Sequence, residues 1–155
     1  MILQPWFITG LAEGESCFSV SFTQRKKLKL GIETRPSFSI SLNQRDLDLL
    51  KLVHAYFKCG SIRYSQSDRT YKYEVRSLDD LVKRIIPHFK EYALHGSKLQ
   101  DFLKFEQICK KVRANLHRSS KYLPEIIEIA YQMNPSGKRK HSKEDLLKIL
   151  DKIVV

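Results

Sequence analysis

The sequence predicts an α+β fold with a four-stranded antiparallel sheet, and two patterns carry that prediction. Apolar and polar residues alternate in four short segments, which is typical of strands with one buried face. Apolar residues recur at three- and four-residue steps in the segments between and after them, which is typical of helices. The expected order is helix, two strands, helix, two strands and then further helices.

The first three elements are expected from local signals. Pro5 suits the opening turn of a helix, and Gly14 can end one, so a helix is expected over residues 5–13. Residues 16–24 then alternate and predict the first strand. A basic turn separates it from the second strand, expected over residues 32–42.

The rest of the chain continues this pattern, mostly as helices. The further elements expected are a helix at 43–57, strands at 61–65 and 70–76, and helices at 78–89, 97–116, 124–133 and 143–153. We expect one domain over residues 1–155, with its core at about 4–115. Additional helices and the basic linker 134–140 fill residues 116–155.

The charge balance favours a polyanionic partner. The chain has 28 Lys and Arg against 17 Asp and Glu, a formal net charge of +11. Nucleic acid is the first candidate and an anionic membrane surface the second, while a basic surface without a partner stays open. No segment reaches the roughly 18 apolar residues that span a membrane, so no membrane-spanning helix is expected. With nucleic acid as the favoured partner, no membrane partner is expected. The three cysteines are scattered, which argues against a disulfide framework and a zinc site.

Two acids stand where a helix should disfavour them. Glu13 and Glu15 fall at the C-terminal end of the first helix, where the helix dipole repels negative charge. Carboxylates and helix carbonyls are ligands that Mg²⁺ or Ca²⁺ takes, so a divalent cation would relieve this repulsion. Two exposed glutamates in a turn are the alternative. Gly10 and Gly14, four residues apart, would let a second helix approach closely, although a cap and a packing position explain them too.

A polar face is expected on the sheet, opposite the apolar alternation. Its members are Ser, Thr, Arg, Lys and Glu side chains, which can read base edges in the major groove while basic groups hold phosphates. A solvated sheet face is the alternative. The expected DNA-binding residues are Ser19, Ser21, Thr23, Arg25, Arg35, Ser37, Ser39, Ser41, Arg63, Ser65, Lys72, Glu74 and Arg76.

The stretch ITGLAEGES, residues 8–16, resembles the motif of the LAGLIDADG homing endonucleases, with Glu in place of both Asp residues and Ser in place of the last Gly. Residues 38–44, FSISLNQ, look like the second strand of that family and its active-site glutamine. Residues 101–104, DFLK, look like its lysine segment. The resemblance covers about residues 4–115 and implies the αββαββα homing-endonuclease fold.

The resemblance implies a set of roles at the active site. Glu15 and the Gly14 carbonyl would hold Mg²⁺, with Mn²⁺ or Ca²⁺ able to substitute for binding. Gln44 would position water, and Lys104 would stabilise developing charge. Glu13 would cap or orient the motif helix rather than bind metal.

A single motif implies a homodimer that cuts both strands of a long, near-palindromic DNA target. Gly10, Glu13 and Gly14 would lie at the dimer interface. The alternatives are an intron maturase that binds intron RNA, a non-cleaving DNA- or RNA-binding protein on the same scaffold, and a basic ribosome-associated domain. The resemblance also favours an organelle, with the mitochondrion ahead of the chloroplast.

Overall fold

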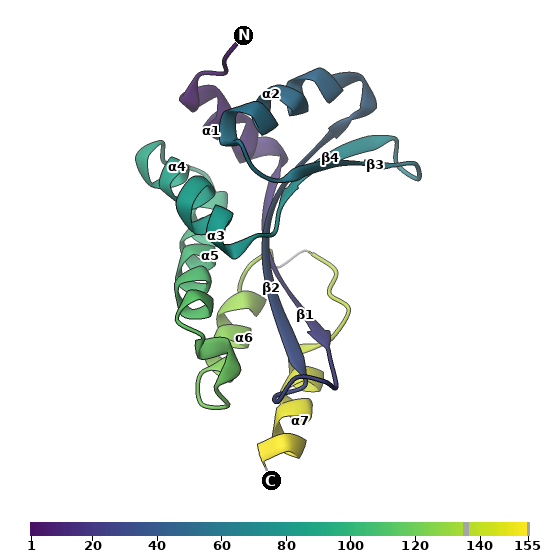
Figure 1. Ribbon diagram of the computed structural model, residues 1–155, viewed down its shortest axis with the longest axis vertical. Helices are drawn as coiled ribbons and strands as arrows, with labels where there is room; N and C mark the ends of the chain where they lie inside the picture. The colour runs from purple at the N-terminus through teal and green to yellow at the C-terminus, as the bar shows by residue number, and fades with distance from the viewer. Residues whose placement is uncertain (135–136, 155) are drawn as a thin grey trace. The chain divides into compact units, whose positions relative to one another are not determined.

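The computed structural model describes residues 1–134 and 137–154, and residues 135 and 136 of the expected linker lie outside this part (Figure 1). Its helices and strands, in chain order, are α1 (Pro5–Glu15), β1 (Ser16–Gln24), β2 (Ile32–Asn43), η1 (Gln44–Asp46), α2 (Leu47–Phe57), β3 (Ser61–Ser65), β4 (Thr70–Val75), α3 (Leu78–Asp80), η2 (Leu81–Ile85), α4 (Ile86–Glu91), α5 (Lys98–Arg113), η3 (Leu116–Arg118), α6 (Leu123–Tyr131) and α7 (Lys143–Val154). The α+β class and the four-stranded antiparallel sheet are confirmed. No helix in the described residues is long and apolar enough to cross a membrane.

The helices expected over residues 43–57, 97–116 and 124–133 are observed over Leu47–Phe57, Lys98–Arg113 and Leu123–Tyr131. Two further differences from the prediction have local reasons. α1 continues to Glu15 because both the backbone N–H and the hydroxyl of Ser16 donate to the Ala12 carbonyl and close its last turn. The helix expected over residues 78–89 is divided by η2, a π-helical turn that precedes Pro87. Proline has no N–H to donate to the preceding turn, which interrupts the regular ladder at this point.

The sheet has the strand order β1-β2-β4-β3. In the antiparallel pairing of β2 with β4, Phe38 lies opposite Val75 and Ser39 lies opposite Glu74. Residues that lie opposite each other point to the same side of a sheet. The register therefore separates an apolar face from a polar face, as the alternation predicted.

The chain divides into two compact units. The first comprises residues 1–18 and 37–99, and the second comprises residues 19–36 and 100–155. The core of the first unit contains a cluster of phenylalanines in which Phe18 packs on Phe38 and Phe89, with ring centroids 5.1 and 5.4 Å apart. The single domain expected from the sequence stays a prediction.

A buried histidine joins α1 to α4 in the first unit. The Thr9 hydroxyl donates to the Tyr92 carbonyl (2.8 Å), so it accepts from His88 Nε2 (3.1 Å). His88 Nδ1 then accepts from the Tyr56 hydroxyl at 2.9 Å. Both ring nitrogens of the neutral imidazole are satisfied, and burial lowers the pKa of His88 to about 4.

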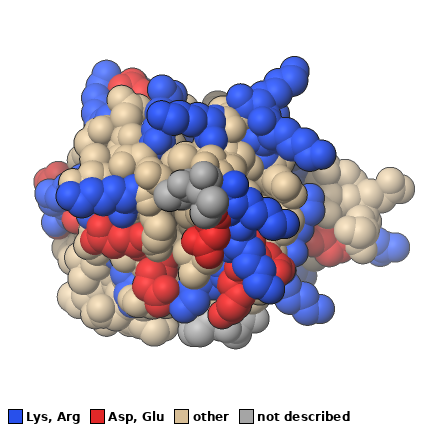
Figure 2. Space-filling model, turned by 90° about the horizontal axis from the view of Figure 1, so that it is seen from below, with Lys and Arg blue, Asp and Glu red and all other residues tan. Residues whose placement is uncertain are grey.

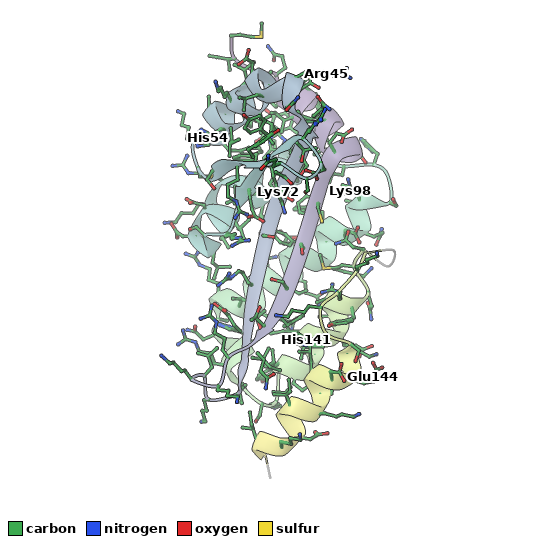
Figure 3. All side chains as sticks on the ribbon, turned by 90° about the vertical axis from the view of Figure 1, so that its right-hand side faces the viewer. Arg45, His54, Lys72, Lys98, His141 and Glu144 are labelled. Atoms are coloured by element: carbon green, nitrogen blue, oxygen red, sulfur yellow. The ribbon has the colours of Figure 1, made fainter. Side chains whose placement is uncertain are left out.

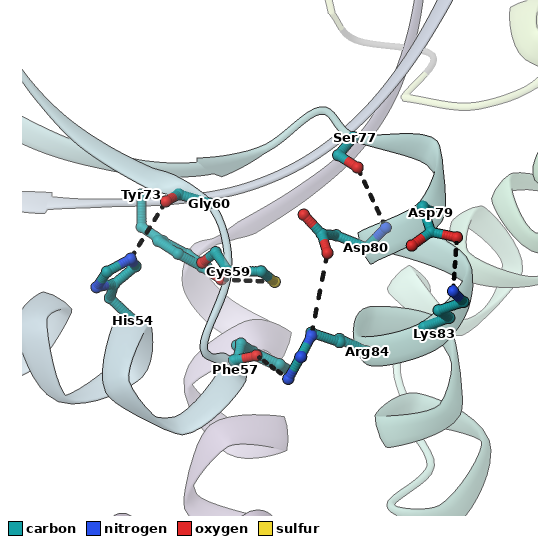
Figure 4. Close-up of polar contacts among 10 residues, drawn as sticks. All are labelled: His54, Phe57, Cys59, Gly60, Tyr73, Ser77, Asp79, Asp80, Lys83 and Arg84. Atoms are coloured by element: carbon teal, nitrogen blue, oxygen red, sulfur yellow. Dashed lines mark hydrogen bonds and ion pairs between the residues drawn. The ribbon is translucent and has the colours of Figure 1, made fainter.

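The turn from α2 into β3 is fixed by contacts to its backbone (Figure 4). Tyr73 donates its hydroxyl to the Cys59 carbonyl at 2.9 Å, and His54 Nε2 lies 3.2 Å from the Gly60 carbonyl. Gly60 has φ +84°, and a Cβ there would lie 2.7 Å from the Glu74 carbonyl. This position therefore requires glycine.

In the second unit, Arg139 of the basic linker has a structural position. Its guanidinium lies 4.3 Å from the centroid of the Tyr131 ring and donates to the carbonyls of Val20 and Ala130 at 2.8 and 2.6 Å. Lys and Arg side chains cover much of the surface seen in Figure 2, with acids grouped among them. The positive charge of Arg139 in this linker is therefore half-buried against a ring and two carbonyls.

Candidate functional site

The C-terminal end of α1 presents the motif acids. Glu15 is the last residue of the helix and is exposed, as is Gly14, while Ala12 and Ile8 face the interior. α1 then passes directly into β1 (Figure 1). Helix carbonyls without intrahelical N–H partners gather at such an end, so this end offers backbone oxygens as well as the exposed Glu15 carboxylate.

Glu13 is engaged within its own chain. Its Oε1 accepts hydrogen bonds from the backbone N–H groups of His95 and Gly96, the latter at 3.2 Å. A Cβ at residue 96 would lie 2.9 Å from Glu13 Oε2, so glycine permits this approach. These bonds hold the Glu13 side chain against its own chain, and its expected role in orienting α1 at a helix interface stays a prediction.

Lys98 supplies the positive charge that α1 needs at this end, and it was not among the residues predicted for the site. Lys98 is labelled in Figure 3. Its Nζ donates to the carbonyl oxygens of Ala12 (3.1 Å) and Ser16 (2.5 Å), which lie before and after Glu15 in the sequence. A cation bound to the last carbonyls of a helix stabilises that end. One signal could have found it: Lys98 is the first residue of α5, where the helix dipole disfavours a cation. The two helix ends with unfavourable charges therefore meet each other.

Gln44 is the first residue of η1, directly after β2, and two hydrogen bonds hold it. Its backbone N–H donates to the Arg69 carbonyl (2.9 Å), and its side-chain Oε1 accepts from the Tyr64 hydroxyl (3.0 Å). β1 and β2 are antiparallel neighbours, so the start of β1 and the end of β2 lie at the same end of the sheet. The first unit therefore carries Glu15 and Gln44 at one end of this strand pair.

Lys104 belongs to the second unit. It lies on α5 and is half-buried. Its expected role at the active site stays a prediction.

The residues present fit a shared metal site better than a complete one. Within residues 1–134 and 137–154, no three His, Cys, Asp or Glu side chains form a group that could hold a metal ion. One chain offers the exposed Glu15 carboxylate next to backbone carbonyls, which are suitable ligands for a hard divalent cation. The remaining ligands would come from outside the chain, such as a phosphate, water or a second carboxylate.

The pairing register places the expected DNA-binding residues of the first unit on one face. Ser41 lies opposite Lys72, and Lys72 lies opposite Arg63. Ser39 and Glu74 share this side of the sheet but are buried at 7 % and 6 % exposure. On the polar face, the basic side chains are therefore more exposed than the smaller or acidic side chains of Ser39 and Glu74.

In the second unit, an acid also organises the basic residues. Glu33 accepts from Arg25 and Arg35, each at 2.8 Å, and these two bonds and charges lower the pKa of its carboxyl group. Ser21 is exposed on β1, and Ser19 and Thr23 are half-buried. Whether these residues bind DNA stays a prediction.

The family model described as LAGLIDADG endonuclease matches residues 8–109. Among curated proteins, "Probable intron-encoded endonuclease 3" of Neurospora crassa is 35 % identical over 133 residues, which are 85 % of this chain and 25 % of that protein. The "Uncharacterized 50.9 kDa protein in ND4 intron 1" of Podospora anserina is 34 % identical over 74 % of this chain and 26 % of that protein. The chain thus spans about a quarter of the length of these relatives.

Two solved structures have a similar fold. The homing endonuclease I-TnaI superposes with a TM-score of 0.85 at 30 % identity, over 99 % of both chains. I-SmaMI bound to an uncleaved DNA target in the presence of calcium ions superposes with a TM-score of 0.86 at 28 % identity, over 97 % of this chain and 49 % of that one.

Proposed function

Because this chain belongs to the LAGLIDADG endonuclease family, we propose that it is a site-specific homing endonuclease that hydrolyses both strands of a DNA duplex. The observation that carries the proposal is the exposed Glu15 carboxylate at the end of α1, next to carbonyls that Lys98 holds. Phosphodiester hydrolysis needs an activated water and stabilised charge on the leaving oxygen. A carboxylate that can bind a cation, together with nearby positive charge, supports this chemistry.

Mg²⁺ is the proposed cofactor, and Glu15 with the Gly14 carbonyl would hold it. When bound, a divalent cation lowers the pKa of water and stabilises charge on phosphate oxygens. The similar I-SmaMI was solved on uncleaved DNA in the presence of calcium ions, which supports a divalent cation here and leaves the choice of Mg²⁺ as our proposal.

Two side chains, Gln44 and Lys98, complete the proposed active site. Gln44 has its Oε1 bonded to Tyr64, so its NH₂ group remains to donate to a water or a phosphate oxygen. Lys98 holds the backbone on either side of Glu15 and adds a positive charge at the reacting phosphate. Lys104 is the alternative source of that charge.

A second copy of the chain would complete the site. The α1 residues Phe7, Gly10 and Gly14 recur at helical spacing and are all exposed, with Phe7 at 48 %. A second α1 could lie close to this face because glycines leave room for its backbone. A homodimer would then place two Glu15 residues at the centre of a near-palindromic target. Two such halves within one longer chain are the other possible outcome.

The polar face of the sheet would bind the DNA. Exposed Arg63, Lys72 and Arg76 suit phosphate oxygens and guanine edges.

The genetic setting of a relative favours an organelle. One relative is named for an ND4 intron, which supports an intron-encoded protein and, in our proposal, a mitochondrial one. An intron maturase that binds RNA is the runner-up.

The proposal can be tested by cleavage of a randomised duplex library carried on plasmids, with sequencing of the cut ends. We expect discrete cuts in Mg²⁺, binding without cutting in Ca²⁺, and loss of cutting in Glu15→Gln. Glu144→Gln is the matched control, because it removes the same charge from an exposed position on α7.

Equal cutting by Glu15→Gln and the wild type would refute the assignment of Glu15. Binding to the library without any cut would favour the non-cleaving alternatives. Preference for structured RNA in a competition experiment would favour the maturase.

A further inference from the structure

We propose that Glu74 does not read DNA itself but positions Arg63 and Arg76 for sequence recognition. This inference rests on the proposed function, because it concerns how the polar face distinguishes one DNA target from another. It departs from the expectation that Glu74 contacts a base.

The Glu74 carboxylate is buried under basic side chains that it holds. Only 6 % of the side chain is exposed, although the polar face is the open side of the sheet. Its Oε1 lies 2.7 Å from Arg63 Nη2 and 2.9 Å from Arg76 Nε, and its Oε2 lies 3.5 Å from Lys72 Nζ. Oε1 faces two guanidinium groups, and the burial of the side chain leaves little room for a cytosine amino group to reach either oxygen.

The neighbouring positions make this arrangement possible. In the register, Ser39 of β2 and Ser61 of β3 lie opposite Glu74 on either side. Small side chains there leave space for the stems of Arg63 and Arg76 to reach the carboxylate. Ser39 is itself buried at 7 %, so the longer side chains cover it.

The arginines keep most of their donors. Arg63 donates one of the five N–H groups of its guanidinium to Glu74, Arg76 forms an ion pair with the same oxygen, and their side chains are 58 % and 49 % exposed. The side chains of Arg63, Arg76 and Glu74 line a hollow of about 220 Å³, together with Gly60 and Ser61. Two partly fixed guanidinium groups at a hollow suit the O6 and N7 acceptors of guanine.

Two roles of Glu74 can be told apart by what its removal does to DNA binding: positioning the two arginines, or only lowering the positive charge that attracts DNA. The three cations and Glu74 together have a net charge of +2, and loss of the acid raises it to +3. If Glu74 only tempered the charge, its removal would strengthen binding to every sequence equally. If it positions the arginines, its removal releases them and weakens discrimination while non-specific attraction rises.

The test is binding selection from a randomised duplex library in Ca²⁺, with wild type, Glu74→Gln, Arg63→Gln and Arg76→Gln. Glutamine keeps the shape and one acceptor but removes the charge. We expect Glu74→Gln to lose roughly tenfold of discrimination at base pairs that include a guanine. Arg63→Gln and Arg76→Gln should lose discrimination at the same base pairs. Non-specific binding should tighten at low salt, with a salt slope steeper by about 0.9.

Asp68→Asn is the matched control. It removes the same charge from the turn of the same hairpin, where Asp68 accepts from Thr70 and no arginine is paired with it in the described contacts. It should raise non-specific binding without changing the sequence profile. Glu74→Asp, which restores the charge on a shorter stem, should regain part of the discrimination.

Three results would overturn the inference. A new preferred base at one position, with the others unchanged, would make Glu74 a direct reader. A uniform loss at all positions, matched by a lower unfolding midpoint, would make it only a structural residue. An unchanged profile would leave it no part in recognition. Because the selection measures binding without cleavage, failure to cut DNA would refute the proposed function separately.

Discussion

Replacing Gly10 by alanine separates the stability of the chain from the pairing of two chains. Gly10 lies inside α1 and is exposed, and a Cβ built there meets nothing within 4 Å. Glycine inside a helix costs about 0.5–1 kcal/mol relative to alanine. The variant chain alone should therefore be more stable by about that amount.

The same methyl group should weaken the homodimer. If two α1 helices pack at Gly10, each copy adds a methyl to a close helix contact, and overpacking of this kind costs typically about 1–3 kcal/mol. Since each 1.4 kcal/mol is about tenfold in affinity, the dimer dissociation constant should rise roughly tenfold or more.

The assay is sedimentation velocity across a concentration series, beside urea unfolding at a dilution where the chain is monomeric. Gln107→Ala, on the exposed side of α5, is the control that gains helix propensity away from α1. A Gly10→Ala chain that gains stability and pairs as well as the wild type would refute the packing of α1 on a second copy.

Three further predictions concern Gly60, His88 and Lys98 of the first unit. Gly60→Ala should destabilise the chain by roughly 2–4 kcal/mol, because it combines a positive φ with a Cβ 2.7 Å from a backbone oxygen; a change below about 1 kcal/mol in urea unfolding would contradict this. His88 has a folded pKa lowered from 6.5 to about 4 by burial, so the unfolded chain binds the proton first, and stability should fall by up to about 3 kcal/mol as the pH drops from 6.5 to 4. This part of the pH dependence should vanish in His88→Gln, and its persistence would assign it to other groups. Lys98→Met should lower the DNA cleavage rate at least a hundredfold with binding retained, whereas Lys104→Met should change it less; the reverse order in single-turnover assays would restore Lys104 to the role expected from sequence.

The strands and the motif helix were predictable because their signals are local. Alternation in residues 16–24 predicted β1 with its observed bounds, and Pro5 marked the first turn of α1. The ends were less predictable where a side chain acts on a distant backbone. Ser16 extends α1 by two residues beyond the expected end through a bond to Ala12, which no periodicity records.

The least predictable features join residues far apart in the sequence. Lys98 reaches the α1 carbonyls across 82 to 86 positions, and only the unfavourable charge at each helix end indicated the pair. Glu74 alternates with basic residues just as a surface residue would, yet it is buried because Arg63 and Arg76 cover it. Burial of this kind depends on cross-strand register, which the pattern of one strand does not contain.

The most direct test of the central claim is plasmid cleavage by an equal mixture of wild type and Glu15→Gln, on a target recovered from the library. If each chain of a homodimer cuts one strand with its own Glu15, mixed dimers should leave nicked circles as a major stable product. The wild type alone should give linear DNA, and Glu15→Gln alone should leave the plasmid intact. A mixture that yields only linear DNA, at about half the wild-type rate, would contradict the account of one Glu15 for each strand.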